Sequence, residues 1–173
     1  MDSYYYLMSS LPDLTADGDM PITYSEFLTC CESNVSEEKY RLLKNLTLSS
    51  TEGPLVSEWA DFYHALMGEL NTQRCQKLGK TYTSAFDKDV YTAQVVDFAL
   101  AAANPLEAER ILLGYEFRYL DMLVGPHTFD DYGLFGYAIK LKLLERLTSF
   151  SHEKGKAEFQ TLFDGIQQQV YSL

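Results

Sequence analysis

Asn104-Pro105-Leu106-Glu107 is the stretch that decides the fold, because three of its residues mark the start of a helix. Asparagine is a favoured N-cap residue, and proline at the first helical position already has the backbone dihedral angle of a helix. Glutamate in the first turn interacts favourably with the helix dipole. Apolar residues then share one helical face up to the glycine–proline pair at 125–126, namely Leu106, Leu113, Phe117, Leu120 and Val124. The stretch therefore predicts a long amphipathic helix.

Two more helices are expected on its C-terminal side. Thr128 is the expected cap of a helix over 131–150, which has an acidic first turn. Its apolar stripe is wide and implies neighbours on more than one side; the stripe contains Leu134, Phe135, Ala138, Ile139, Leu141, Leu143, Leu144, Leu147 and Phe150. Ser151 is the expected cap of a last helix over 152–170, with Phe159, Leu162, Phe163 and Ile166 facing inward.

Four helices are expected before residue 104. Thr23 and Glu26 fit a capping box that starts a helix ending near Cys31. Ser36 opens a second helix, with glutamates in its first turn and Leu42, Leu43 and Leu46 on its buried side. A long third helix, over 55–79, has an apolar face and a natural stop at Gly79; the face is formed by Leu55, Trp59, Phe62, Leu66 and Leu70. A loop over 80–88 separates it from a fourth helix, over 89–102.

Residues 4–22 are expected to be irregular, with Tyr4–Leu7 as a short extended segment. The whole pattern predicts an all-α fold without strands. Short connections between helices favour an antiparallel bundle of six to seven helices. We expect residues 1–173 to form a single helical domain, with the loop over 80–88 as the candidate boundary between two lobes.

The chain has 173 residues and a formal charge of -11. That charge argues against nucleic acid and anionic membrane surfaces as partners, because both are themselves negative. No apolar run approaches the ~20 residues that span a bilayer, and the N-terminal residues do not resemble a secretory signal. Three cysteines without a paired motif predict neither disulfides nor a zinc site. The expected location is the cytoplasm.

No pattern in the sequence predicts catalysis or a cofactor. Asp61 and His64 stand three residues apart on a helix, but a single such pair is not a metal site. Glutamates and arginines in the helix after Asn104 have the residue types of acid–base machinery. They are better interpreted as surface pairs, such as Glu107 with Arg110 at i, i+3. We therefore predict no catalytic residues, no metal and no cofactor.

Lys140, Lys142 and Arg146 form the one modest basic group of the chain. Lys142 and Arg146 are one helical turn apart, so the group is a candidate surface for an acidic partner. The alternative is an ordinary solvated helix face, since charged residues are common on any protein surface.

Several stretches resemble a family of small bacterial proteins encoded beside the genes of V/A-type ATPases. They are Tyr4-Tyr5-Tyr6-Leu7, Leu11-Pro12-Asp13-Leu14, Tyr24-Ser25-Glu26-Phe27-Leu28, Asn104-Pro105-Leu106-Glu107-Ala108-Glu109, the run from Tyr137 to Arg146, and Glu153-Lys154-Gly155. That family is similar to the connector of these ATPases, a helical, funnel-shaped protein that joins the central stalk to the membrane rotor ring. The connector is longer, so this chain matches only part of such a funnel.

The resemblance implies a non-catalytic component that couples the central stalk to the rotor ring during proton or sodium transport. Its partners are then other proteins of the V/A-type ATPase, and its location is peripheral to the inner membrane through that complex. The residues alone leave two alternatives open. One is a helical adaptor or regulatory interaction protein unrelated to the ATPase, and the other is an enzyme with a helical active site.

Overall fold

The computed structural model describes residues 4–83, 85–86 and 89–148, and every regular element in that part of the chain is a helix. In chain order these are α1 (Tyr5–Ser10), α2 (Tyr24–Glu32), α3 (Glu37–Lys44), α4 (Val56–Lys77), α5 (Val90–Leu100), α6 (Pro105–Val124) and α7 (Asp131–Thr148). The predicted all-α fold is therefore confirmed for the described residues. The helix predicted over 152–170, its cap Ser151 and the last two residues of the helix predicted over 131–150 lie outside them.

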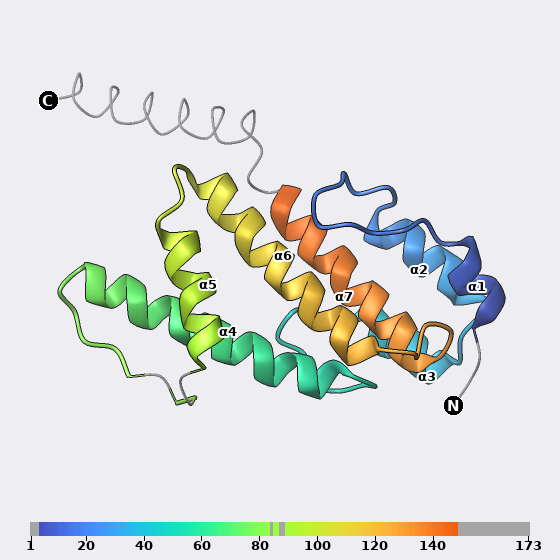
Figure 1. The fold of residues 1–173 in the computed structure, drawn as a ribbon. Coiled ribbons are helices and arrows are strands. Elements are labelled where there is room, and N and C mark those ends of the chain that lie inside the picture. Colours follow the sequence, from blue (N-terminus) through green and yellow to red (C-terminus); the bar gives the residue numbers. More distant parts are fainter. Residues whose placement is uncertain (1–3, 84, 87–88, 149–173) are drawn as a thin grey trace, which may run out of the picture.

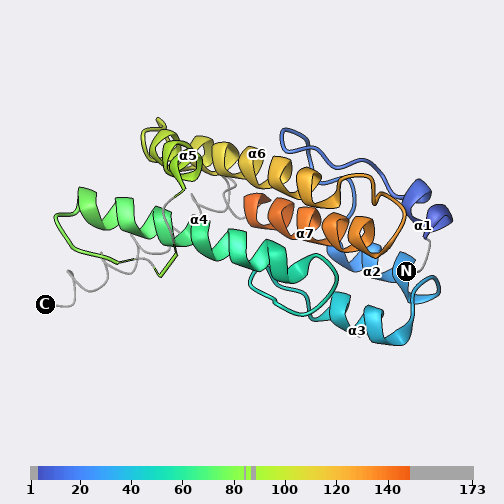
Figure 2. The same ribbon diagram turned by 60° about the horizontal axis from the view of Figure 1, so that its bottom comes forward.

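Helix α6 occupies the centre of the arrangement, with α5 on one side and α7 on the other (Figure 1). A short loop over 125–130 joins α6 to α7, so the two run antiparallel. Helix α2 packs on α7 and on α3. Figure 2 shows α4 running along the α6–α7 pair, with α3 near its N-terminal end. The helices on either side of the loop over 80–88, α4 and α5, pack against each other.

The core contains aromatic and aliphatic residues from every helix. Its largest fully buried side chains include Trp59, Phe27 and Phe135, from α4, α2 and α7. The indole N–H of Trp59 donates a hydrogen bond to the backbone oxygen of Leu48 at 3.1 Å. A buried polar atom needs such a partner, and this one ties the loop before α4 to the core.

Two predicted helix starts are confirmed in atomic detail. The hydroxyl of Thr23 accepts the backbone N–H of Glu26 at 3.2 Å, and the Glu26 carboxylate accepts the backbone N–H of Thr23 at 2.7 Å. This is the reciprocal pattern of a capping box. At the start of α6, Asn104 Oδ1 accepts the backbone N–H of Glu107 at 2.9 Å, and Pro105 is the first helical residue.

The expectation of an extended segment at Tyr4–Leu7 is wrong, because these residues lead into α1. Contacts distant in sequence explain the difference. The backbone N–H of Tyr4 donates to the oxygen of Phe129 at 2.7 Å, and Leu7 is buried in the core. A helix this short is marginal by itself, so tertiary contacts stabilise it.

One predicted helix cap also needs correction. Thr128 does not cap α7; Asp130 precedes the helix, and its carboxylate accepts the backbone N–H of Tyr132 at 2.9 Å. The long helix α4 begins at Val56, because Leu55 adopts a left-handed conformation with φ of 65°. Leu55 is nevertheless buried, so packing stabilises a conformation that leucine rarely adopts.

The loop between α6 and α7 approaches the first turn of α7 so closely that only glycine fits at position 133. A Cβ there would collide with the backbone oxygens of Thr128 and His127. It would lie only 2.6 Å from the His127 oxygen. We expect Gly133→Ala to lower the free energy of unfolding by about 1–3 kcal/mol in urea titrations. Gly114→Ala in α6 meets open space and should raise it by up to about 1 kcal/mol. Equal stability of the two variants would contradict the predicted clash.

The cap of α5 makes its stability depend on pH. Asp89 accepts the backbone N–H of Thr92 at 2.7 Å and its hydroxyl at 2.8 Å, and these bonds hold the pKa of Asp89 below its ordinary 3.8. A depressed pKa means that the stabilisation is present above pH 3.8 and disappears as the carboxylate is protonated below it. Asp89→Ala should therefore cost about 1 kcal/mol at pH 7. The difference from wild type should shrink in denaturation experiments at more acidic pH. Asp97→Ala, a substitution in the same helix that leaves the cap at Asp89 intact, is the control.

Candidate functional site

Three charged side chains meet at the interface between α6 and α7. The guanidinium of Arg146 donates to both carboxylate oxygens of Glu116, from Nη1 at 2.9 Å and from Nη2 at 2.5 Å. Its Nε donates to Glu109. The Glu116 side chain is 0% exposed and that of Arg146 only 21%, so the pair is largely withdrawn from water. A bidentate arginine–carboxylate contact is the strongest geometry for such a pair.

Burial raises the pKa of Glu116, because a low-dielectric environment disfavours the charged carboxylate; the hydrogen bonds and charge of Arg146 act in the opposite direction. Burial also acts to lower the pKa of Arg146, but the two glutamates outweigh it and raise that pKa above its ordinary value. The guanidinium therefore keeps its proton, and its N–H groups are directed at protein carboxylates. The arrangement joins α6 to α7.

Arg146, Glu109 and Glu116, which we call the ion cluster, were not expected to meet. The sequence pattern placed the glutamates of this helix on its surface. A signal was nevertheless present, since Glu109 and Glu116 are seven residues apart and share a helical face with the buried Leu113 and Leu120. Acidic residues within an apolar stripe need a cation from a neighbouring element.

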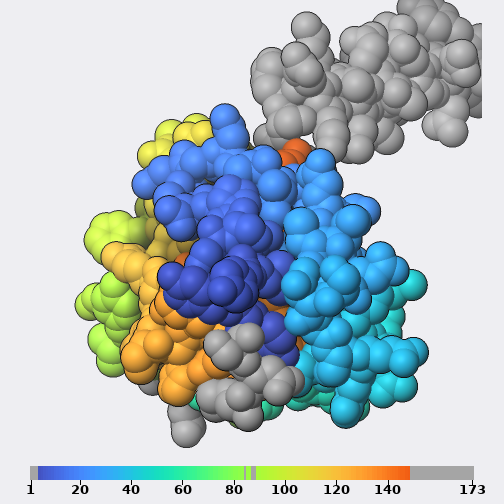
Figure 3. All heavy atoms as spheres, turned by 90° about the vertical axis from the view of Figure 1, so that its right-hand side faces the viewer, coloured from blue at the N-terminus to red at the C-terminus, as the bar shows by residue number. Residues whose placement is uncertain are grey.

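A second polar cluster joins α1, α3 and α7 at the end of the molecule seen in Figure 3. The Tyr4 hydroxyl donates to Asp131 Oδ1 at 3.0 Å, and the Lys39 ammonium donates to the same oxygen at 2.6 Å. Burial raises the pKa of the Tyr4 hydroxyl, and Asp131 adds to this effect while the hydrogen bond from Lys39 opposes it. The phenol therefore stays protonated as a donor, and this cluster also has a structural role.

The structure does not bring Lys140, Lys142 and Arg146 together as one basic surface. Lys140 pairs with Asp121 of α6 at 2.5 Å. Lys142 pairs with Glu145 at 3.0 Å, and its ammonium lies 3.6 Å from the ring centroid of Tyr24 in α2. Arg146 belongs to the ion cluster. The three cations therefore contact three different neighbours, and the guanidinium of Arg146 is directed at carboxylates of the protein itself.

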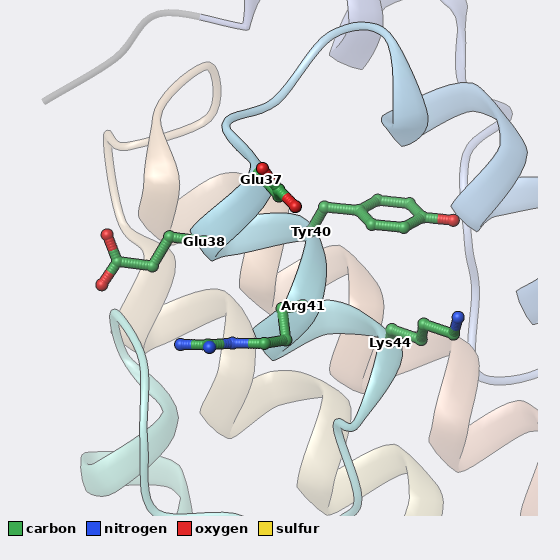
Figure 4. Close-up of a pocket in the computed structure, with 5 residues that line it drawn as sticks. All are labelled: Glu37, Glu38, Tyr40, Arg41 and Lys44. Carbon is green, nitrogen blue, oxygen red and sulfur yellow. The ribbon is translucent and has the colours of Figure 1, made fainter.

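A hollow lies on the outside of α3. Glu37, Glu38, Tyr40, Arg41 and Lys44 line it, all from a single helix. Figure 4 shows their side chains pointing in different directions, with Glu38 and Arg41 on one side of the helix and Tyr40 and Lys44 on the other. Ligand sites instead have a few polar groups that converge on one point.

The described residues contain no group of three or more His, Cys, Asp or Glu side chains that could hold a metal ion. They also contain no helix long and apolar enough to cross a membrane. Burial raises the pKa of the Cys31 thiol to about 12, so this thiol is not a nucleophile at neutral pH.

No protein-family model matches the chain, and neither does any curated protein or any solved structure.

Loss of the cation from the ion cluster should destabilise the protein strongly. Arg146→Met leaves the Glu116 carboxylate buried without a cation, and we expect the free energy of unfolding to fall by about 3–5 kcal/mol. Arg118→Met is the matched control, since Arg118 is exposed and hydrogen-bonds to the Gly114 oxygen of its own helix. Urea titrations of both variants measure the difference. A cost below about 1 kcal/mol for Arg146→Met would mean that the cluster does not hold α7 against α6.

Proposed function

We propose that this chain is a non-catalytic, connector-like component of a bacterial V/A-type ATPase that couples the central stalk to the membrane rotor ring. The observation that carries the proposal is the series of stretches along the sequence that resembles proteins encoded beside these ATPases. ATP hydrolysis and ion movement take place in other proteins of the complex. The chain then lies on the cytoplasmic side of the inner membrane through its partners, without entering the bilayer.

A coupling protein must transmit torque, and the packing of the helices supports such a role. Torque passes through a protein only if its helices keep their relative positions, and close-packed interiors deform little. The bidentate contact between Arg146 and Glu116 resists sliding of α7 along α6, because sliding would leave a carboxylate buried and uncompensated. The cluster of Tyr4, Lys39 and Asp131 holds α1 and α3 against the start of α7 in the same way.

A coupling protein also needs two contact surfaces, and the two ends of the molecule differ in chemistry. Residues 4–50, which include α1, α2 and α3, contain seven acidic and three basic residues. Helix α5, at the other end in Figure 1, contains a single charged residue, Asp97. One end therefore suits a basic partner surface, and the other suits an apolar one.

A helical adaptor unrelated to the ATPase is the second candidate function. The exposed apolar side chains of α5 favour an adaptor as much as an ATPase component, because they indicate a protein contact without identifying the partner. The two candidates differ in which proteins accompany the chain in the cell.

Purification of the native complex distinguishes the two candidates. We expect the tagged chain, expressed from its own chromosomal locus, to bring down the catalytic and stalk proteins of the ATPase in constant ratio. We also expect the ATPase from cells in which the gene of this chain is deleted to hydrolyse ATP while its ion transport falls by about tenfold or more, because hydrolysis is no longer coupled to the ring. A tagged acidic protein of similar size from the same cells serves as the control. An intact ATPase that contains every other component and lacks this chain would rule out the proposed function.

A further inference from the structure

The outer face of α5 differs from an ordinary solvated helix surface. We define this face by its residues Val90, Tyr91, Gln94, Asp97 and Phe98. Val90 is 69% exposed, Tyr91 52% and Phe98 70%. With 3.6 residues per turn, the five positions span an arc of about 120°, and the buried Val95, Val96 and Ala99 lie on the opposite side. Three large apolar side chains are therefore grouped on one face of one helix.

The neighbouring helix α6 provides an internal comparison. Its exposed positions include Glu107, Arg110, Arg118 and Asp121, as expected for a helix face in contact with water. The outer face of α5 has only one charged residue, Asp97, where the exposed face of α6 has several. Interface cores are depleted of charged residues and enriched in aromatic ones. The outer face of α5 has this composition, and the exposed face of α6 does not.

The backbone under this face is held firmly by the rest of the protein. Gln73 of α4 donates to the backbone oxygen of Ala93 at 2.9 Å, and Lys77 donates to that of Leu100 at 3.2 Å. The hydroxyls of Thr92 and Tyr115 lie 2.8 Å apart, which ties α5 to α6. A groove between α4 and α5 borders the face and is lined by Gln73, Gln76, Val90, Ala93, Gln94 and Asp97. The surface is thus preformed, which lowers the conformational cost of binding.

Charge distinguishes between the possible occupants of this face. Asp97 forms no ion pair with any cation in the described part of the chain, so it is available to a basic group. A second copy docked on the face would add another chain of charge -11 and a second Asp97, while α5 has no cation to pair with either. Like charges at an interface disfavour such a pair. A partner with a cation opposite Asp97 is attracted both by the Asp97 carboxylate and by the net charge of -11 of this chain.

We propose that the outer face of α5 binds an apolar helical stripe of another protein of the V/A-type ATPase, with a lysine or arginine of that stripe opposite Asp97. This inference rests on the proposed function, since it assigns the contact surface to one end of the proposed coupling protein. Phe98 and Val90 insert between side chains of the partner helix, in the way that apolar residues on helices pack into grooves. Asp97 fixes the register through its ion pair.

The test uses the tagged full chain and the native ATPase, with catalytic components measured by immunoblot. Phe98→Glu and Asp97→Lys should each reduce the recovered ATPase by about tenfold or more, as loss of a central interface residue does. Met122→Glu is the matched control, because Met122 is an apolar residue of α6 with 66% exposure outside this face. It should leave recovery unchanged. Circular dichroism should show the same helicity in all three variants.

A photo-crosslinking amino acid at position 98 identifies the occupant directly. We expect a crosslink to a helical segment of an ATPase protein that has an apolar stripe and a basic residue within it. A crosslink to a second copy of this chain, or a dimer in solution that Phe98→Glu dissociates, would replace the proposal by self-association. If the tagged wild-type chain and the α5 variants recover the ATPase to the same extent, the assigned face is wrong and the proposed function is unaffected. If wild type recovers no ATPase, both are wrong.

Discussion

The contact of Arg146 with Glu109 and Glu116 joins the two helices that pack against most of the others. Helix α6 packs on α5, α7 and α4, and α7 in turn supports α2. The guanidinium joins α6 to α7 by bonds to two carboxylates, of which Glu116 is completely buried. Isolated charges in such a position are very costly, so each of the three residues requires the others. Apolar contacts provide most of the stability. The paired charges disfavour any shift of α7 along α6 that would separate the buried Glu116 carboxylate from Arg146.

Helix starts were predictable from the sequence where their determinants are local. The capping box at Thr23 and the cap at Asn104 each involve residues three apart, so the sequence predicts their hydrogen bonds directly. Where contacts between distant residues decide the structure, prediction was wrong. Helix α1 depends on Tyr4 meeting Phe129 and Asp131, more than 120 residues away, and Leu55 is left-handed because its side chain is buried.

The interpretation of charged side chains depended even more strongly on tertiary structure. A pattern of charges on a helix does not tell which of them face water. The glutamates of α6 were interpreted as surface residues, and Arg146 as a candidate for an acidic partner or for a solvated face. Arg146 instead contacts both Glu109 and Glu116. The outer face of α5 could not be recognised in advance for the same reason. Its apolar residues look like core residues in the sequence, and only the positions of α4 and α6 show that they remain uncovered.

Trp59 has a practical consequence for anyone who studies this protein in solution. It is the single tryptophan of the chain, it is fully buried, and its indole N–H is bonded to the backbone of the loop before α4. Indole emission moves to longer wavelength when the ring enters water, so fluorescence from one residue reports on the packing of α4. The outer face of α5 belongs to a different helix. Trp59 fluorescence therefore shows whether the fold around α4 is intact, independently of any measurement of binding at α5.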